Sequence, residues 1–169
     1  MTTFKETQKF DQPLIWIGII AIGMIITFVF GVGLYKQLIQ GLPFGNNPMS
    51  YNGLIFTFVL TTLLFIGLIL LFAFARLSTI IDKNGIEYRF FPFQCQYRKI
   101  SWNDIEKQEV ITYKPIREYG GWGIRFGKKG KAFNVAGDKG LQLYLKNGKQ
   151  ILIGTQKDVD LADFLTTLK

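Results

Sequence analysis

The chain is 169 residues long, carries a net charge of +8 and contains no histidine. It therefore lacks the commonest general base and metal ligand, and its single cysteine, Cys95, excludes an internal disulfide and a thiolate metal cage. No nucleophile–base pair and no phosphate-cradling loop is recognisable. We therefore expect no enzyme, no cofactor and no catalytic or metal-binding residues.

Two long apolar runs dominate the first half of the chain. Leu14–Leu34 and Leu54–Phe74 each contain 21 residues and no charged side chain. At 1.5 Å per helical residue, such a run extends roughly 30 Å, the thickness of the hydrocarbon core of a bilayer. We predict two transmembrane helices. The first is too long for a cleaved signal peptide and has no small-residue cleavage site after it.

The charges that flank the apolar runs predict the topology. Lys5 and Lys9 precede the first run and Arg76 and Lys83 follow the second, whereas the connector holds a single lysine. The positive-inside rule then places both termini of a multi-pass plasma-membrane protein in the cytoplasm. The predicted parts are a cytoplasmic N-terminal segment (residues 1–13), the first transmembrane helix (14–35), an extracytoplasmic loop (36–53), the second transmembrane helix (54–75) and a cytoplasmic domain (77–169).

Small residues recur at a spacing of four in both apolar runs. They are Gly23, Thr27 and Gly31 in the first run, and Thr57 and Thr61 in the second. Aligning the midpoints of an antiparallel helix pair puts Thr27 level with Thr61 and Gly31 level with Thr57. We therefore predict that these residues form the contact between the helices. The alternative is that Gly and Thr are simply common in such helices.

From Leu77 onward the pattern changes to short strands. This region holds 16 Lys and Arg against 10 Asp and Glu in 93 residues, enough chain for one small domain. Asn84-Gly85 and Asn147-Gly148 are strong signals for β-hairpins. We predict antiparallel strands at residues 78–82, 86–91, 97–101, 107–113, 121–126, 131–135, 140–145 and 150–154. One amphipathic helix follows them at residues 158–168.

Four motifs stand out in this region, at Ile80–Ile86, Ile100–Ile105, Arg117–Arg125 and Ile151–Lys157. They resemble the motifs of bacterial pleckstrin-homology-like (PH-like) domains that follow membrane helices. The resemblance implies an α+β membrane protein, in which an N-terminal transmembrane helical hairpin precedes a PH-like antiparallel β-barrel or sandwich with a C-terminal capping helix. It implies a membrane-tethered interaction or sensing module and carries no catalytic residues over to this chain.

A basic cluster gives the sharpest indication of a binding surface. Its members are Arg125, Lys128, Lys129, Lys131 and Lys139. Beside an anionic cytoplasmic leaflet each lysine adds roughly 1 kcal/mol of attraction, so this face is a candidate for anionic lipid headgroups or a protein partner. The alternative is a solvated face without a special role. No nucleic-acid partner is expected, because no reader motif accompanies the cluster.

These features predict a membrane-anchored PH-like interaction or scaffold module. Its partners would be the lipid bilayer and either a protein or an anionic lipid at the cytoplasmic face of the membrane. The alternative is an accessory subunit of a larger membrane complex that acts mainly through its transmembrane helices. Formation of a homo-oligomer is left open by the sequence.

Overall fold

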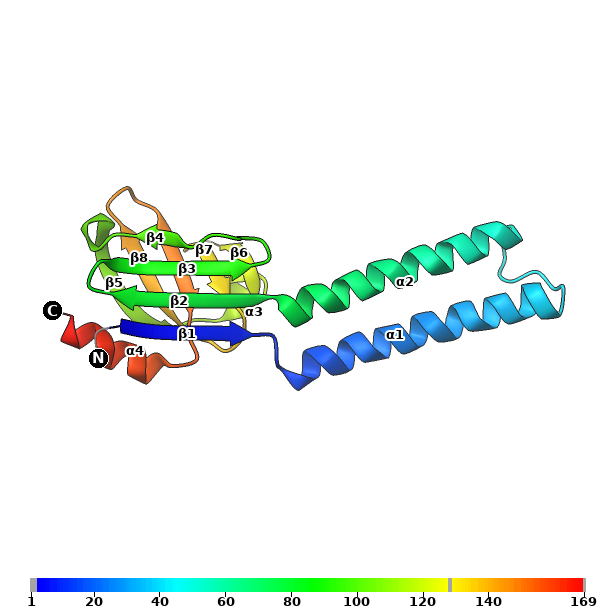
Figure 1. The fold of residues 1–169 in the computed structure, drawn as a ribbon, viewed down its shortest axis with the longest axis horizontal. Helices are drawn as coiled ribbons and strands as arrows, with labels where there is room; N and C mark the ends of the chain where they lie inside the picture. Colours follow the sequence, from blue (N-terminus) through cyan, green and yellow to red (C-terminus); the bar gives the residue numbers. More distant parts are fainter. Residues whose placement is uncertain (1–2, 128, 169) are drawn as a thin grey trace. The chain divides into compact units, whose positions relative to one another are not determined.

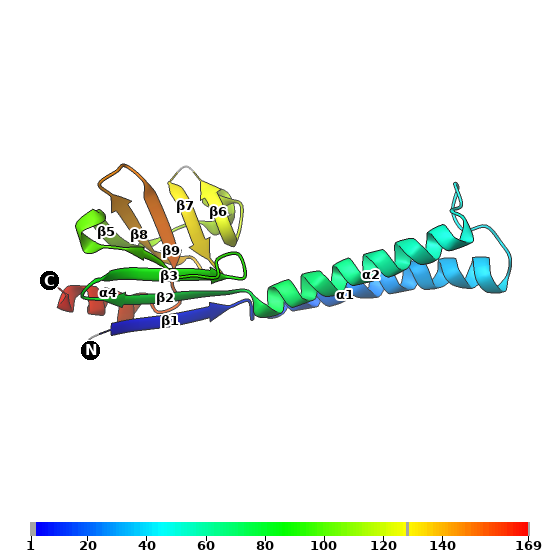
Figure 2. The same ribbon diagram turned by 45° about the horizontal axis from the view of Figure 1, so that its top comes forward.

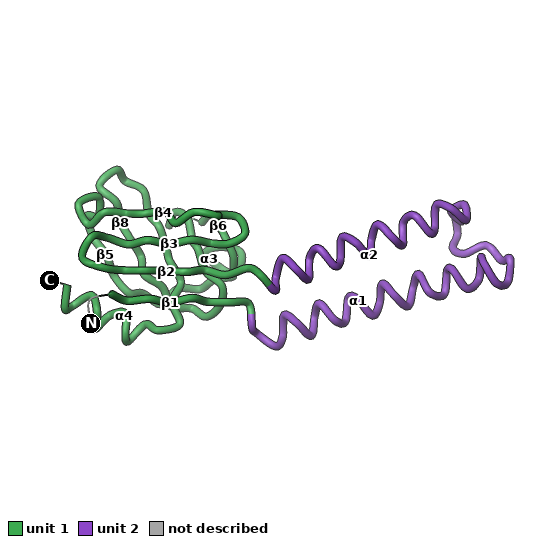
Figure 3. Tube along the Cα trace, in the orientation of Figure 1, with its two compact units in different colours: residues 1–10, 74–169 green, residues 11–73 purple. Residues whose placement is uncertain are grey.

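The computed structural model describes residues 3–127 and 129–168 of the chain. The chain divides into two compact units (Figure 3). Unit 1 comprises Met1–Phe10 and Phe74–Lys169, and unit 2 comprises Asp11–Ala73. Unit 2 is therefore an insertion between two segments of the chain that fold together.

Unit 2 is a pair of helices (Figure 1). Helix α1 (Pro13–Leu34) continues into a short π-helical turn, η1 (Tyr35–Ile39), and a connector leads to helix α2 (Tyr51–Phe74). Both helices are long and apolar enough to cross a membrane, and only 6% of the most apolar stretch of each is buried. A core helix of a globular domain buries a broad apolar stripe, so these two helices do not form such a core.

Two side-chain contacts fix the register of the helix pair. The rings of Phe30 and Phe58 lie 5.3 Å apart. Gly23 faces Phe65, and a Cβ added to this glycine would lie 2.7 Å from ring atom Cε1. Both contacts agree with the predicted alignment of the midpoints of the two apolar runs.

The small residues do not all lie in this contact. Gly23, Thr57 and Thr61 are half-buried, but Thr27 and Gly31 are exposed, and a Cβ at Gly31 would meet nothing within 4 Å. The reason is geometric. With 3.6 residues per turn, a series spaced by four drifts about 40° around the helix at each step. Gly31 has thus rotated away from the face that Gly23 presents.

Unit 1 contains two sheets. The first is an antiparallel sheet of four strands in the order β1 (Thr3–Lys9), β2 (Arg76–Asp82), β3 (Gly85–Phe91) and β4 (Arg98–Ile100) (Figure 1). The predicted Asn-Gly turn joins β2 to β3, and within it the Asp82 carboxylate accepts a hydrogen bond from the Asn84 N–H at 2.7 Å.

The second sheet has five strands. Their order is β5 (Ile105–Thr112), β8 (Lys139–Leu145), β9 (Gln150–Gly154), β7 (Gly130–Asn134) and β6 (Gly123–Gly127). The 3-10 turn η2 (Trp102–Asp104) precedes β5, the short helix α3 (Pro115–Tyr119) precedes β6, and helix α4 (Asp158–Thr167) follows β9. The prediction of purely antiparallel strands is wrong at one pair. The β6–β7 hairpin joins the sheet on the side of β9 that β8 leaves free, and β7 runs parallel to β9.

Strand β1 lies in a segment for which the sequence predicted no strand. Its buried face includes Glu6 and Gln8, which are 7% and 2% exposed. The Glu6 carboxylate accepts hydrogen bonds from the Thr155 hydroxyl and the Gln156 N–H, both at 2.7 Å. Gln8 Nε2 donates to the Gly154 carbonyl at 2.7 Å. These bonds tie the segment before α1 to the end of β9 and to the residues that follow it.

The two sheets lie face to face (Figure 2), and aromatic side chains connect them. The ring centroids of Tyr88 in β3 and Phe133 in β7 are 4.8 Å apart. Phe164 of α4 packs on Phe4 of β1 at 6.1 Å. A second cluster forms on the other face of the five-stranded sheet, because Ala132 points opposite to its neighbour Phe133; its members are Tyr113, Tyr119, Ala132 and Leu152.

Candidate functional site

The described members of the predicted basic cluster do not share one face of their sheet. Lys129 makes an ion pair with Glu118 at 3.0 Å. Lys139 Nζ donates to the Thr112 hydroxyl at 2.6 Å, at the start of β8. Arg125 and Lys131 lie on β6 and β7, and Lys128 lies outside the described residues.

Arg125 and Lys131 point to opposite sides of their sheet. The β6–β7 register pairs Arg125 with Ala132 and Phe126 with Lys131, and successive residues of a strand alternate between faces. Arg125 Nε donates to the Trp122 carbonyl at 2.8 Å. Of the described members of the predicted cluster, only Lys131 lines the cavity described next.

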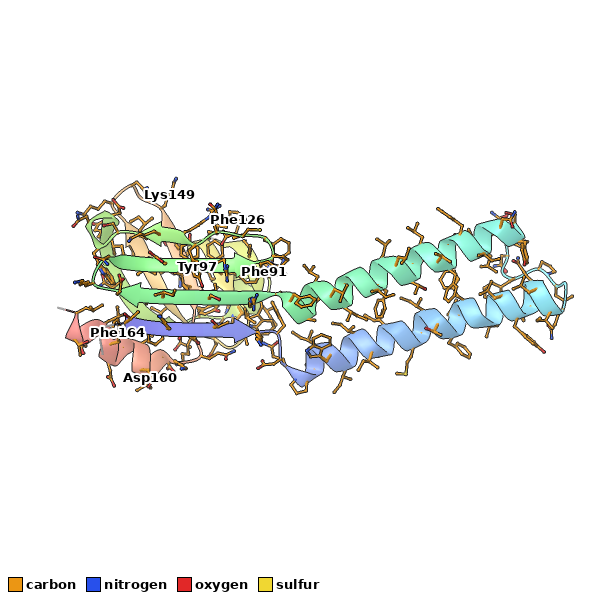
Figure 4. All side chains as sticks on the ribbon, in the orientation of Figure 1. Phe91, Tyr97, Phe126, Lys149, Asp160 and Phe164 are labelled. Atoms are coloured by element: carbon orange, nitrogen blue, oxygen red, sulfur yellow. The ribbon has the colours of Figure 1, made fainter. Side chains whose placement is uncertain are left out.

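A cavity of about 740 Å³ opens between the two sheets of unit 1. Its walls come from β3 and β4 on one side, and from the β6–β7 and β8–β9 hairpins on the other. Figure 4 labels Phe126 and Lys149, one from each hairpin. Three cationic side chains line it, Arg98, Lys131 and Lys149, and no carboxylate stands among the described residues of its walls. We call this feature the basic cavity.

Lys131 is the half-buried cation of the basic cavity. Its Nζ lies 4.9 Å from the ring centroid of Phe126 and 5.0 Å from that of Phe133, within range of cation–π attraction. Burial, and then the positive charge of Arg98, lower the pKa of the Lys131 amine. Among the described residues no carboxylate forms an ion pair with Lys131.

Arg98 enters the basic cavity from β4. It stands opposite Tyr88 in the strand pairing and shares its face, whereas its neighbour Lys99 points to the other face and pairs with Glu87 at 3.5 Å. Tyr88 is only 3% exposed. Burial raises the pKa of its hydroxyl, and the nearby Arg98 partly offsets this increase.

Glycines shape the rim of the basic cavity. Gly130 has a φ of +87° and starts β7 in direct contact with the backbone of Gln150, where any Cβ would collide. Gly148, with a φ of +78°, forms the tight turn between β8 and β9 that presents Lys149. The two hairpins can approach each other closely at Gly130 because this position carries no side chain.

The rest of the wall is partly apolar. Leu145 and Ile151 line it together with Phe126, which is 77% exposed, and the polar side chains of Asn147 and Gln150 lie beside them. Cations beside an apolar surface suit an anionic ligand that carries an organic group. Within the described part of the chain, no group of three or more Cys, Asp or Glu side chains could hold a metal ion.

Sequence reasoning missed two of the three cations. Arg98 and Lys149 lie far in sequence from the predicted cluster, and only the pairing of β3 with β4 and the β8–β9 turn bring them to Lys131. The second Asn-Gly turn was a usable signal for Lys149, since it places that lysine at a hairpin tip. No comparable signal existed for Arg98.

Comparison with known proteins adds no functional assignment. No protein-family model matches the chain, and no curated protein matches its sequence.

Proposed function

We propose that this protein is a membrane-anchored PH-like interaction module of the plasma membrane. Unit 2 anchors it, and unit 1 binds an anionic lipid or a protein partner at the cytoplasmic face. The observation that carries the proposal is the exposure of the two long apolar helices. Leu14, Phe28 and Leu64 are 81%, 72% and 68% exposed, a state that water disfavours and a bilayer stabilises.

The position of unit 2 in the chain supports an anchor over a cleaved signal sequence. Strand β1 precedes α1 and pairs along its whole length with β2, which follows α2. Cleavage after α1 would detach β1 from the rest of unit 1. Glu6 and Gln8 would then leave the hydrogen bonds that they make with residues 154–156.

The charges at the base of unit 2 support a cytoplasmic unit 1. Lys9 at the end of β1 is the strand partner of Arg76 at the start of β2. Both basic residues therefore flank the anchor at the ends that connect to unit 1, whereas the connector between the helices holds only Lys36. By the positive-inside rule this side is the cytoplasm, and both termini lie there.

A second candidate function is that of an accessory subunit acting through its helices. An apolar hollow of about 780 Å³ lies on the helix pair, lined by Gly23, Thr27, Phe65 and Ile69 among others. Small residues beside such a hollow let another helix approach closely. This candidate would make a membrane protein, or a second copy of the chain, the principal partner.

Membrane fractionation of the full-length protein tests the anchor. Wild-type protein should stay in the membrane pellet after an alkaline carbonate wash. Leu64→Lys places a charge near the middle of α2 and should disfavour insertion by about 2.5 to 3.5 kcal/mol, releasing a larger fraction. Val159→Lys, at a 67% exposed position of α4, is the matched control and should behave as wild type. Release of the wild-type protein would refute the anchor.

Native mass spectrometry of gently extracted protein separates the two candidate functions. Retained anionic lipid without a protein partner supports the lipid-binding module. A stoichiometric membrane-protein partner that is lost when the hollow is filled, as in Thr27→Leu, supports the accessory subunit.

A further inference from the structure

We infer that the basic cavity of unit 1 binds a phosphate ester, with Arg98, Lys131 and Lys149 surrounding the phosphate group. Figure 4 shows one of these side chains, Lys149, on its hairpin, with Phe126 on the neighbouring one. A lipid headgroup and a soluble ester share this phosphate chemistry.

Three cations gather in this cavity without a carboxylate among its described residues. Three lysines elsewhere in unit 1 do stand beside carboxylates, in the pairs Lys99–Glu87, Lys107–Glu109 and Lys129–Glu118, at 3.5, 2.8 and 3.0 Å. The three cations of the cavity have no carboxylate in the described walls. Lys131 is half-buried, whereas Arg98 and Lys149 are exposed. Like charges gathered around Lys131 repel one another, so a bound anion would stabilise the arrangement.

The types of cation favour phosphate. The planar guanidinium of Arg98 can hold two oxygens of one phosphate side by side, and the two lysines add compact positive charges. A phosphate monoester carries nearly two negative charges at neutral pH, which three cations can balance. A carboxylate would supply only one.

The size and lining of the cavity favour an ester over inorganic phosphate. A volume of about 740 Å³ lies in the range of cavities that hold small organic ligands and far exceeds a phosphate ion. Leu145, Ile151 and Phe126 offer apolar contact for the organic group. The half-buried Lys131 joins the cationic part of the wall to the apolar part, since its amine stands over the Phe126 ring.

The two sources of the phosphate can be separated with two probes. Glycerol 3-phosphate represents a soluble ester, and phosphatidic acid in micelles of uncharged detergent represents a lipid headgroup. Only the lipid source rests on the proposed membrane function. Binding is measured by calorimetry on the full-length protein in the same micelles. If unit 2 were not a membrane anchor, the fractionation experiment would show it, and the binding measurement would still test the cavity.

The expected result is saturable binding of at least one probe. Binding of glycerol 3-phosphate supports the inference with a soluble ligand, and binding of phosphatidic acid alone supports it with a lipid. The double variant Arg98→Gln, Lys149→Gln should weaken that binding at least tenfold. Lys83→Gln, which removes a charge at the exposed β2–β3 turn, should change it less than twofold. Absence of binding by both probes, or equal weakening in the control variant, would overturn the inference.

A second measurement needs no substitution and guards against misfolded variants. Acetylation of lysines by acetic anhydride is quantified by mass spectrometry with and without the probe that binds. The probe should protect Lys131 and Lys149 severalfold and leave Lys83 unprotected. Equal protection of all three lysines would show that the anion acts without a site and would overturn the inference.

Discussion

The two units differ in how far they bury side chains of the same apolar types. In unit 1, Leu77 and Phe133 are fully buried, and aromatic contacts join the two sheets. In unit 2, Phe28 and Leu64 are mostly exposed. Unit 1 therefore completes its hydrophobic core within the chain, whereas unit 2 leaves most of its apolar side chains exposed. Apolar content alone therefore does not identify a core.

Removing one phenyl ring from each unit tests this difference in burial, and we expect it to give the largest change in the free energy of unfolding of unit 1. Phe133→Ala deletes a fully buried ring that packs on Tyr88 and should lower the free energy of unfolding of unit 1 by about 3 to 5 kcal/mol. Phe28→Ala should leave it within about 0.5 kcal/mol. Urea unfolding of the full-length proteins in micelles, followed by near-UV circular dichroism, measures both. Equal losses would mean that the units do not have separate cores.

High pH should weaken unit 1 through Tyr113. Burial, partly offset by a hydrogen bond from Asn134, raises the pKa of this hydroxyl to about 12. In the unfolded chain this hydroxyl ionises near pH 10. Its contribution to the free energy of unfolding is therefore complete below pH 10 and is lost as the pH rises toward 12. The loss should reach about 2 to 3 kcal/mol.

The matched variant for this effect is Tyr113→Phe. It should flatten the decline of stability between pH 10 and 12, at a cost of about 1 kcal/mol near neutral pH for the lost hydrogen bond. Thermal unfolding across this pH range measures both terms. An equally steep decline in the variant would assign the alkaline sensitivity to other groups.

The polar attachment of β1 gives the next prediction. Glu6→Gln exchanges a buried acceptor of two hydrogen bonds for an amide and should destabilise unit 1 by about 1 to 3 kcal/mol. Lys5→Gln, at the adjacent exposed position, should have almost no effect. Amide hydrogen exchange of β1 and β2 reports the difference locally. Unchanged exchange in the Glu6 variant would mean that β1 is held by its strand pairing alone.

The smallest effect concerns the helix pair. Gly23→Ala brings a methyl group against the Phe65 ring and should disturb the contact by about 1 kcal/mol, whereas Gly31→Ala enters open space. A cysteine crosslink between residues 30 and 58, placed in each variant, measures how often the helices meet. The rate should fall in the first variant only, and an equal fall in both would contradict the observed register.

Much of the fold could be predicted because its signals are local. The Asn-Gly turns and the long uncharged runs each depend on neighbouring residues. Strand β1 escaped prediction because two of its buried side chains, Glu6 and Gln8, are polar and hide the expected hydrophobic alternation. Their burial becomes understandable only once their partners near Gly154 are known.

The site was less predictable than the fold. Counting basic residues that are near one another in the sequence finds Lys131, but it also finds Lys129 and Lys139. Lys129 forms an ion pair with a neighbouring carboxylate, and Lys139 donates a hydrogen bond to a neighbouring hydroxyl. Arg98 joins Lys131 only through the packing of one sheet on the other. Such proximity depends on long-range register, which a single sequence does not display.

The most direct test of the membrane account uses the only cysteine in the chain. Cys95 is exposed in unit 1, so a membrane-impermeant maleimide should label it in permeabilised cells and not in intact spheroplasts. A Cys95→Ser, Asn46→Cys variant moves the thiol to the connector between the helices and should be labelled in intact spheroplasts. Labelling of Cys95 and protection of the thiol at position 46 would show the inverted topology. The same accessibility for both thiols would show that unit 2 does not span the membrane.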